Sequence, residues 1–100
     1  TMLILNLLKK EDMYGYQMIK KLKETSEDVF ELKEGTLYPI LHTLEEKRYI
    51  TSYWDESYSK KRKYYSITKK GKDVLKEKEA EWRIFSNGIN KVLGGVSFAN

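Results

Sequence analysis

The apolar residues of this chain change their spacing twice, and this change constrains the fold more than any other feature. Up to about residue 47 they recur at intervals of three and four, as on amphipathic helices. From Tyr49 to Thr68 two segments rich in aromatic and β-branched residues flank the polar stretch 55–62, which indicates an antiparallel hairpin. After Thr68 the helical spacing returns. This order predicts a mainly α fold with one small β-hairpin.

Two short helices are predicted first. Residues 3–8 form an almost continuous apolar run that ends at Lys9-Lys10, where cations suit a helix C-terminus. The chain therefore starts like the middle of an apolar helix, and its natural N-terminus is expected upstream of Thr1. No signal peptide is expected, because a basic lead and a small-residue cleavage site are missing. A second helix follows near Gly15, which would allow a neighbour to approach closely; its core face is Met18, Ile19 and Leu22.

The third helix is predicted from about Gly35 to Lys47, with an apolar stripe of Leu37, Ile40, Leu41 and Leu44. Pro39, the only proline, is expected near the first turn, because proline deeper in a helix removes a backbone hydrogen bond. The N-terminal part of the opposite face has no carboxylate, and its hydroxyls and ring can bind phosphates or base edges. Its candidate DNA-binding residues are Thr36, Tyr38, Pro39 and His42. For Tyr38 and His42 an ordinary surface role is the alternative.

A long last helix is predicted from Thr68, a suitable N-cap, to about Gly94. Its apolar residues follow a heptad pattern that only Lys78 interrupts: Leu75, Trp82, Phe85, Ile89, Val92 and Val96. A domain of this size cannot bury the whole seam. We therefore expect the seam to pack against the same helix of a second copy of the chain, in a homodimer. An intrachain core helix is the alternative. Residues 1–70 are predicted to form a winged helix-turn-helix, and residues 71–100 are predicted to form a dimerisation helix.

Positive charge is concentrated in one part of the chain. The net charge is +4, but residues 57–72 contain no carboxylate and seven cations: Lys60, Lys61, Arg62, Lys63, Lys69, Lys70 and Lys72. Such a stretch indicates a polyanionic partner, although a solvated surface loop is the alternative. With the second and third helices as a helix-turn-helix, the third helix would enter the major groove. The hairpin cations Lys60 to Lys63 would then lie along the flanking backbone.

Other classes of function have little support in the sequence. There is no cysteine and a single histidine, and no glycine-rich phosphate loop precedes a helix. An enzyme, a metal site and a cofactor are therefore not expected. The apolar runs are too short to span a bilayer, and a cytoplasmic location fits the cysteine-free composition. Two binding roles remain as alternatives, namely a winged-helix module for protein–protein contact without specific DNA binding, and RNA binding.

The chain resembles the PadR family, winged-helix regulators that are mainly bacterial repressors. The resemblance covers residues 3–93 and rests on the order and spacing of several motifs: Tyr14-Gly15-Tyr16, Glu34-Gly35-Thr36-Leu37-Tyr38-Pro39, Leu41, Leu44-Glu45, Ile50-Thr51-Ser52-Tyr53-Trp54, Arg62-Lys63-Tyr64-Tyr65 and Ile67-Thr68 through Gly71. The short single C-terminal helix is similar to that of the smaller subgroup. The wing departs from the family pattern, because Tyr58-Ser59-Lys60 stands where glycines are common.

The resemblance implies a homodimer joined through the last helix with help from the first. It also implies double-stranded DNA with an inverted repeat as the target, recognition helices in successive major grooves, and repression. Family DNA contacts map onto Thr36, Tyr38, Lys61, Arg62 and Lys63. Trp82 aligns with an interfacial tryptophan that stacks on small phenolic or planar ligands in some relatives, so a small aromatic effector is expected beside it. The candidate ligand-binding residues are Trp82, Phe85, Leu7 and Leu8. A tryptophan that only fills the dimer core is the alternative.

Overall fold

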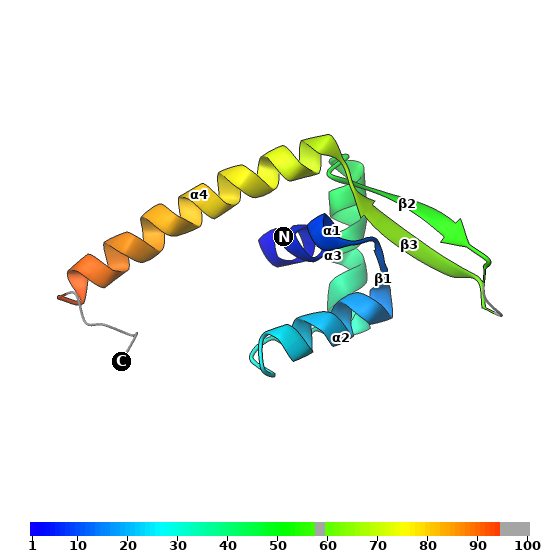
Figure 1. Ribbon diagram of the computed structural model, residues 1–100, viewed down its shortest axis with the longest axis horizontal. Helices are drawn as coiled ribbons and strands as arrows, with labels where there is room; N and C mark the ends of the chain where they lie inside the picture. The colour runs from blue at the N-terminus through cyan, green and yellow to red at the C-terminus, as the bar shows by residue number, and fades with distance from the viewer. Residues whose placement is uncertain (58–59, 95–100) are drawn as a thin grey trace.

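Four helices and a three-stranded sheet make up residues 1–57 and 60–94, the part of the chain that the computed structural model describes (Figure 1). In chain order they are α1 (Met2–Lys10), β1 (Met13–Tyr14), α2 (Gly15–Thr25), α3 (Glu34–Glu46), β2 (Ile50–Asp55), β3 (Arg62–Ile67) and α4 (Lys69–Val92). The predicted mainly α fold with a hairpin is confirmed. The strand β1 was not predicted, because two residues are too few to show an alternation of apolar and polar positions.

The sheet is antiparallel, with β3 between β1 and β2. The hairpin register pairs Ile50 with Ile67 near its base and Asp55 with Arg62 near its tip. On the other side of β3, only Met13 and Tyr14 are paired, opposite Tyr65 and Tyr64. Because β1 is so short, the tip half of β3 has no strand partner on that side among the described residues.

The hydrophobic core lies where α1 meets the other helices and the base of the sheet. Its members come from every element of the fold: Ile4, Leu5, Leu7, Leu8, Met13, Met18, Leu22, Leu37, Leu41, Leu44, Ile50, Tyr65 and Leu75. The core contains no buried charged or polar side chain among the described residues. Burial of these apolar side chains, each contributing about 1.5–3 kcal/mol when complete, provides the main stabilisation of the fold.

The core corrects three expectations. Leu75 was expected on the dimer seam, but it is 1% exposed and packs inside its own chain. Leu7 and Leu8 were expected beside an effector, but they too are buried in the core, and neither lines a hollow at the start of α1. Their burial follows from the apolar run of α1, which is covered on several sides. Surfaces for a second subunit or a ligand must therefore come from other residues.

Pro39 also differs from its expected position. It is the sixth residue of α3, which begins at Glu34, and so lies beyond the first turn. At this place it removes the hydrogen bond that its own amide would have made to the carbonyl of Gly35. Residue 35 is a glycine with open space around it, so the helix can adjust there. The Thr43 hydroxyl donates to the Pro39 carbonyl at 3.1 Å, one turn later.

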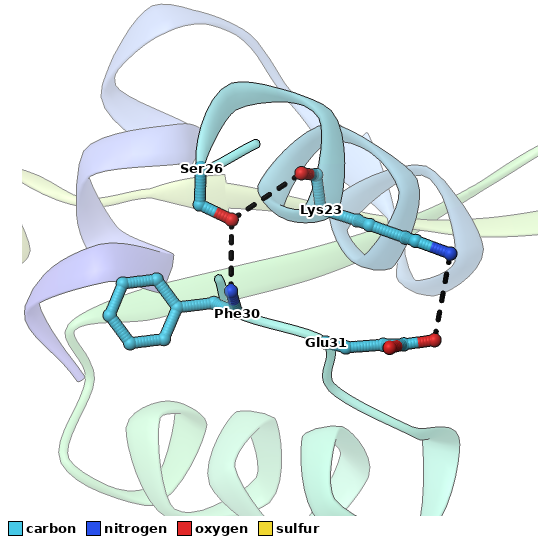
Figure 2. Close-up of polar contacts among 4 residues, drawn as sticks. All are labelled: Lys23, Ser26, Phe30 and Glu31. Carbon is cyan, nitrogen blue, oxygen red and sulfur yellow. Dashed lines mark hydrogen bonds and ion pairs between the residues drawn. The ribbon is translucent and has the colours of Figure 1, made fainter. Parts of the chain in front are cut away.

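The turn between α2 and α3 sets the angle of the helix-turn-helix. Glu27 and Asp28 adopt left-handed backbone angles, with φ of 52° and 68°, which reverse the chain at the end of α2. Figure 2 shows how the turn is held: the Ser26 hydroxyl accepts a hydrogen bond from the Phe30 amide at 3.0 Å and lies 3.4 Å from the Lys23 carbonyl. A salt bridge of 3.5 Å joins Lys23 to Glu31 across it. These local bonds offset the cost of two left-handed residues that are not glycine.

The helix α4 begins against the base of the hairpin and then leaves the domain. The Thr68 hydroxyl accepts from the Gly71 amide at 3.0 Å, which confirms the predicted N-cap. Gly71 packs so closely on Tyr49 and Ile67 that a side chain there would meet both. Beyond α1 the helix runs away from the other elements, and it gives the molecule its long dimension of 54 Å against 28 and 22 Å (Figure 1). None of the described helices is long and apolar enough to cross a membrane.

Candidate nucleic-acid interface

The solvent face of α3 carries the side chains that the sequence analysis selected. Thr36, Tyr38, Pro39 and His42 are all exposed, whereas Leu37 and Leu41 point into the core. The two sides of this face border different hollows. Tyr38 lines a cleft toward α2 and the hairpin, and Pro39 lines a hollow toward Thr1. These four side chains therefore remain open to solvent between the two hollows.

Tyr38 is held in place by the start of α2. Its ring lies over Gly15, and a Cβ atom built on that glycine would be 2.8 Å from Cζ of Tyr38 and closer still to the hydroxyl. The predicted role of Gly15 in a close approach is confirmed, and the approaching group is the Tyr38 side chain. Tyr38 remains 44% exposed, so one edge of the ring is available to a ligand.

The hairpin extends from the domain as a wing, defined here as residues 50–57 and 60–67, with its cations near the tip (Figure 1). Lys60 and Lys61 are exposed, while Arg62 and Lys63 are half-buried on β3. Two of the cations have acidic neighbours. Lys61 lies 3.6 Å from the Glu56 carboxylate, and Lys63 lies 4.0 Å from that of Glu45 on α3. The Glu45 carboxylate also accepts a 2.9 Å hydrogen bond from Ser52, which fixes the wing to α3.

Three consecutive wing cations lie over aromatic rings, a feature that sequence reasoning missed. The distances from the cation to the ring centroid are 5.0 Å for Lys61 over Trp54, 4.5 Å for Arg62 over Tyr14 and 5.7 Å for Lys63 over Tyr65. Cations within about 6 Å of a ring centroid are attracted by its negative face. The signal was present in the sequence as basic residues between aromatic segments, but only the strand register shows which ring lies under which cation.

A cleft of about 330 Å³ lies between these groups and α3. It lies between the start of α2, the first half of α3 and the wing, and it is lined by Tyr14, Gly15, Tyr16, Tyr38, Trp54, Arg62, Lys63 and Tyr65. Tyrosine hydroxyls and two cations converge on it, and it contains no carboxylate side chain. Its chemistry suits an anionic ligand with flat or apolar parts, such as the sugar-phosphate backbone of a nucleic acid.

Three tyrosines form a row across the sheet beside this cleft, which Tyr14 also lines. Tyr53 and Tyr64 stack with centroids 5.8 Å apart, and Tyr14 meets Tyr64 edge-on at 5.4 Å. The Tyr53 hydroxyl donates a 2.7 Å hydrogen bond to Asp12, between α1 and β1. This hydrogen bond to a carboxylate, with a smaller contribution from burial, raises the pKa of Tyr53 to about 12. The row ties the wing to the core domain through the short connection before α2.

The lysines at the start of α4 lie where they were predicted, within its first four residues. Lys69 is 3.8 Å from the Asp73 carboxylate, and Lys70 lies over the Tyr49 ring at 5.6 Å. These contacts offset part of the unfavourable interaction between cations and a helix N-terminus, about 0.3–1 kcal/mol each. Their position is thus less costly to the fold than the sequence alone indicated, and it is weaker support for a nearby phosphate.

The outer half of α4 presents an apolar seam that the other described residues of the chain leave exposed. Trp82, Phe85, Ile89 and Val92 are exposed, and the rings of Trp82 and Phe85 lie 5.9 Å apart. Val96, the last residue of the predicted seam, lies outside the described residues. Hollows of about 290 and 340 Å³ flank Trp82, both bordered by Met2 of α1. Leu3 and Asn6 line the first of them, so these α1 residues replace Leu7 and Leu8 beside Trp82.

The described residues contain no cluster of three or more histidine, cysteine, aspartate or glutamate side chains that could hold a metal ion. His42 is exposed on α3 and points away from the core. What the fold does bring together is an uncovered α3 face, a wing with ordered cations, and a protruding apolar helix. Residues 4–77, which include the first two of these features, match the sequence profile of the transcriptional regulator PadR-like family. The chain belongs to the PadR-like family of transcriptional regulators.

Solved structures agree with this assignment over nearly the whole PadR-like chain. A PadR family transcription regulator from Clostridium difficile is 41% identical, with a TM-score of 0.83 over 92% of this chain and 95% of the other. A transcriptional regulator from Clostridium thermocellum is 36% identical, with a TM-score of 0.84 over 99% and 91%. The transcriptional regulator YqjI of Escherichia coli is 28% identical over 88% of this chain but only 41% of its own length. Members of the family are regulators of transcription and not enzymes.

Proposed function

We propose that this PadR-like regulator binds double-stranded DNA as a homodimer and represses transcription. We also propose that it is located in the cytoplasm of its cell. The observation that carries the proposal is the cleft that joins Tyr38 of α3 to Arg62 and Lys63 of the wing. A base-reading helix and a phosphate-binding wing thus border one continuous surface, which is what a winged-helix protein needs to contact a groove and its flanking backbone together.

In this proposal α3 enters the major groove with Thr36, Tyr38, Pro39 and His42 toward the DNA. The Thr36 and Tyr38 hydroxyls and the His42 ring can hydrogen-bond phosphates or base edges. The wing cations Lys60, Lys61, Arg62 and Lys63 neutralise phosphates without reading sequence, so they supply affinity that falls steeply with salt. Specificity then comes from α3 and affinity largely from the wing.

The dimer in this proposal forms through the outer half of α4. Its four exposed seam residues, Trp82, Phe85, Ile89 and Val92, are large and apolar, and a soluble monomer rarely leaves such a stripe uncovered. Because an isologous contact pairs the same surface of two copies, an antiparallel pair of α4 helices would cover both seams at once. A homodimer also explains an inverted-repeat target, since two-fold protein symmetry is matched by two-fold symmetry in the DNA.

The hollows beside Trp82 support an effector at this interface. Each is bordered by the Trp82 ring together with residues of α1 or α4, and they lie where the second subunit would approach. A planar aromatic compound could stack between the two Trp82 rings, with Phe85 beside it. Release of DNA by such a compound follows if its binding changes the angle between the two subunits. If Trp82 only fills the dimer core, planar compounds will leave its fluorescence unchanged.

Selection of bound duplexes from a random double-stranded pool at physiological salt tests the proposal. We expect enrichment of an inverted repeat with half-sites about one helical turn apart. A matched protein with Thr36, Tyr38 and His42 replaced by alanine should enrich nothing, and its melting curve shows that it is still folded at the temperature of the selection. If the unaltered protein stays folded and dimeric but enriches no sequence, the DNA-binding proposal is wrong, and a protein–protein role for the winged helix takes its place. Competition with duplex RNA separates the two nucleic acids.

A further inference from the structure

The wing cations differ in how they are held. Lys61 and Lys63 each lie near a carboxylate, at 3.6 and 4.0 Å, which a phosphate would have to displace. No ion pair to Arg62 occurs within residues 1–57 and 60–94, although Arg62 is opposite Asp55 in the register. Its guanidinium lies instead over the Tyr14 ring, at 4.5 Å, the shortest of the cation–ring distances in that part of the chain.

The short strand β1 creates the place for this contact. Tyr14 pairs with Tyr64, and the next residue, Gly15, already begins α2. The edge of β3 beyond Tyr64 is therefore left open on this side, and the Arg62 side chain fills the space above the Tyr14 ring. Both residues line the cleft that Tyr38 also borders. Arg62 and the α3 side chain Tyr38 thus border the same cleft.

The way an arginine lies on a ring decides which of its donors remain free. A guanidinium over an aromatic face uses its flat side, and the five N–H donors around its edge stay available for a phosphate. An arginine that is free in solvent must lose rotamer freedom when it binds an anion, whereas one already on a ring has lost part of it. Trp54, which is exposed, restricts the rotamers of Lys61 in a similar way, with the ammonium 5.0 Å from the ring centroid, and Glu56 lies on the other side of that ammonium at 3.6 Å.

We infer that Tyr14 and Trp54 are positioning residues for DNA binding: their rings hold Arg62 and Lys61 ready beside the cleft, which receives the sugar-phosphate backbone of one DNA strand. This inference rests on the proposed function and adds residues that need not touch a base. Tyr65, the third ring, is 4% exposed in the core, so it stabilises the fold as well and is not suitable for a test.

A double-mutant cycle between Tyr14 and Arg62 tests the inference on the duplex that selection yields. We expect Tyr14→Leu to weaken binding about fivefold and to lower the salt slope by about one phosphate contact, since Arg62 is no longer held. Tyr14→Phe keeps the ring and should bind normally. The decisive comparison is between Arg62→Ala and the double variant Tyr14→Leu/Arg62→Ala. Both should bind the duplex equally well, because Tyr14 has no arginine left to hold. If the two losses multiply instead, Tyr14 does not act through Arg62 and the inference is overturned.

Tyr14 also packs on Tyr64, so its loss could lower stability for reasons unrelated to Arg62. Thermal unfolding of the four proteins of the cycle, compared with their salt slopes of DNA binding, separates the two effects. A merely structural role of Tyr14 lowers the melting temperature of the protein but leaves the salt slope unchanged. Trp54 offers an independent cycle on an exposed ring: Trp54→Leu and Lys61→Ala should be coupled in DNA affinity, with Trp54→Phe as the conservative control. Additive losses in this second cycle would remove Trp54 from the proposal.

The position of the DNA backbone on the protein can be tested separately by fluorescence. Trp54 and Trp82 are the only tryptophans of the chain, so Trp82→Phe leaves Trp54 as a single fluorescent probe in the cleft. Duplex DNA should reduce quenching of Trp54 by acrylamide, a neutral quencher that DNA does not repel. If the protein binds the duplex in a gel-shift assay but quenching is unchanged, the cleft is not the backbone site, while the proposed function stands. Failure of the unaltered protein to bind any duplex would instead refute the proposed function.

Discussion

The Tyr38 hydroxyl occupies the space in which a Cβ atom of residue 15 would lie, so the ring of the recognition helix rests directly on the backbone of α2. Gly15→Ala should therefore displace the Tyr38 ring, because the far end of that side chain is what a Cβ atom would meet. Overpacking of this kind costs about 1–3 kcal/mol, and it should lower both the melting temperature and the affinity for the selected duplex. Gly35→Ala is the matched control, because no atom lies within 4 Å of a Cβ there and alanine favours a helix. An equal melting temperature for Gly15→Ala and the unaltered protein would contradict this contact.

The N-cap of α4 makes a separate prediction about stability. The Thr68 hydroxyl accepts from the Gly71 amide at 3.0 Å and lies 2.7 Å from the Arg48 carbonyl, so it joins α4 to the residues before β2. Thr68→Ala should lower the free energy of unfolding by about 0.5–2 kcal/mol. Thr68→Ser keeps the oxygen and should recover most of the loss in urea unfolding. If serine were as destabilising as alanine, the methyl group and not the cap would be the important part.

The apolar seam of α4 predicts the effect of a charge on assembly. Phe85→Asp places a carboxylate in the middle of the proposed interface and should raise the dimer dissociation constant at least about 30-fold, since central aromatic anchors contribute about 2 kcal/mol or more. Sedimentation at several concentrations measures this. Asn87→Asp adds the same charge to an exposed position on another face of the helix and should leave the dimer intact. Equal behaviour of the two variants would show that the seam is not the interface.

The wing cations predict a decrease in affinity that does not depend on sequence. Lys61, Arg62 and Lys63 replaced together by alanine should weaken binding to selected and random duplexes by similar factors. The dependence of log K on log salt should flatten by about 0.9 for each phosphate that the protein no longer neutralises. Tyr38→Ala should instead cost more on the selected duplex than on random DNA. Unchanged affinity of the triple variant at physiological salt would exclude the wing from the interface.

The raised pKa of Tyr53 predicts how the tie between wing and domain depends on pH. Because the hydrogen bond to Asp12 raises this pKa from 10.0 to about 12, its stabilisation is complete below pH 10 and is lost as the pH rises through 12. Tyr53→Phe should therefore be less stable than the unaltered protein at neutral pH, and the difference should disappear at the alkaline end. Asp12→Asn should lower the pKa of Tyr53 in an absorbance titration. A stability difference that does not change with pH would contradict this tie.

The elements with a clear periodicity were predictable from the sequence, and those that depend on tertiary contacts were not. The three early helices, the hairpin and the Thr68 cap were all predicted correctly, because spacing and capping are local properties. Leu75 could not be separated from the seam of Trp82 and Ile89, since a heptad pattern does not show where a helix leaves its own domain. Pro39 lies one residue deeper in α3 than predicted, because the helix begins at Glu34 and not at Gly35, and helix ends cannot be placed to a single residue from spacing alone.

The candidate site shows the same division. Exposure of Thr36, Tyr38 and His42 followed from the stripe on α3, so the recognition face was predictable. The ring beneath Arg62 was not, because Tyr14 is 48 positions earlier in the chain and reaches it only through the pairing of β1 with β3. Contacts between distant segments need the register, and a strand of two residues leaves no trace of register in the sequence.

The length of α4 beyond the core has a consequence for which DNA the protein can occupy. The helix is anchored at Thr68 beside the wing, and its outer half carries the proposed contact with the second copy. In the proposed dimer it would be a rigid spacer between the winged helix and the two-fold axis, with a rise of about 1.5 Å per residue. One heptad added to α4 between the winged helix and the proposed contact would keep the same helix face toward the partner. It would move each winged helix outward by about 10 Å, close to three base-pair steps. In the proposed dimer, the number of turns of α4 would therefore set the spacing of the operator half-sites.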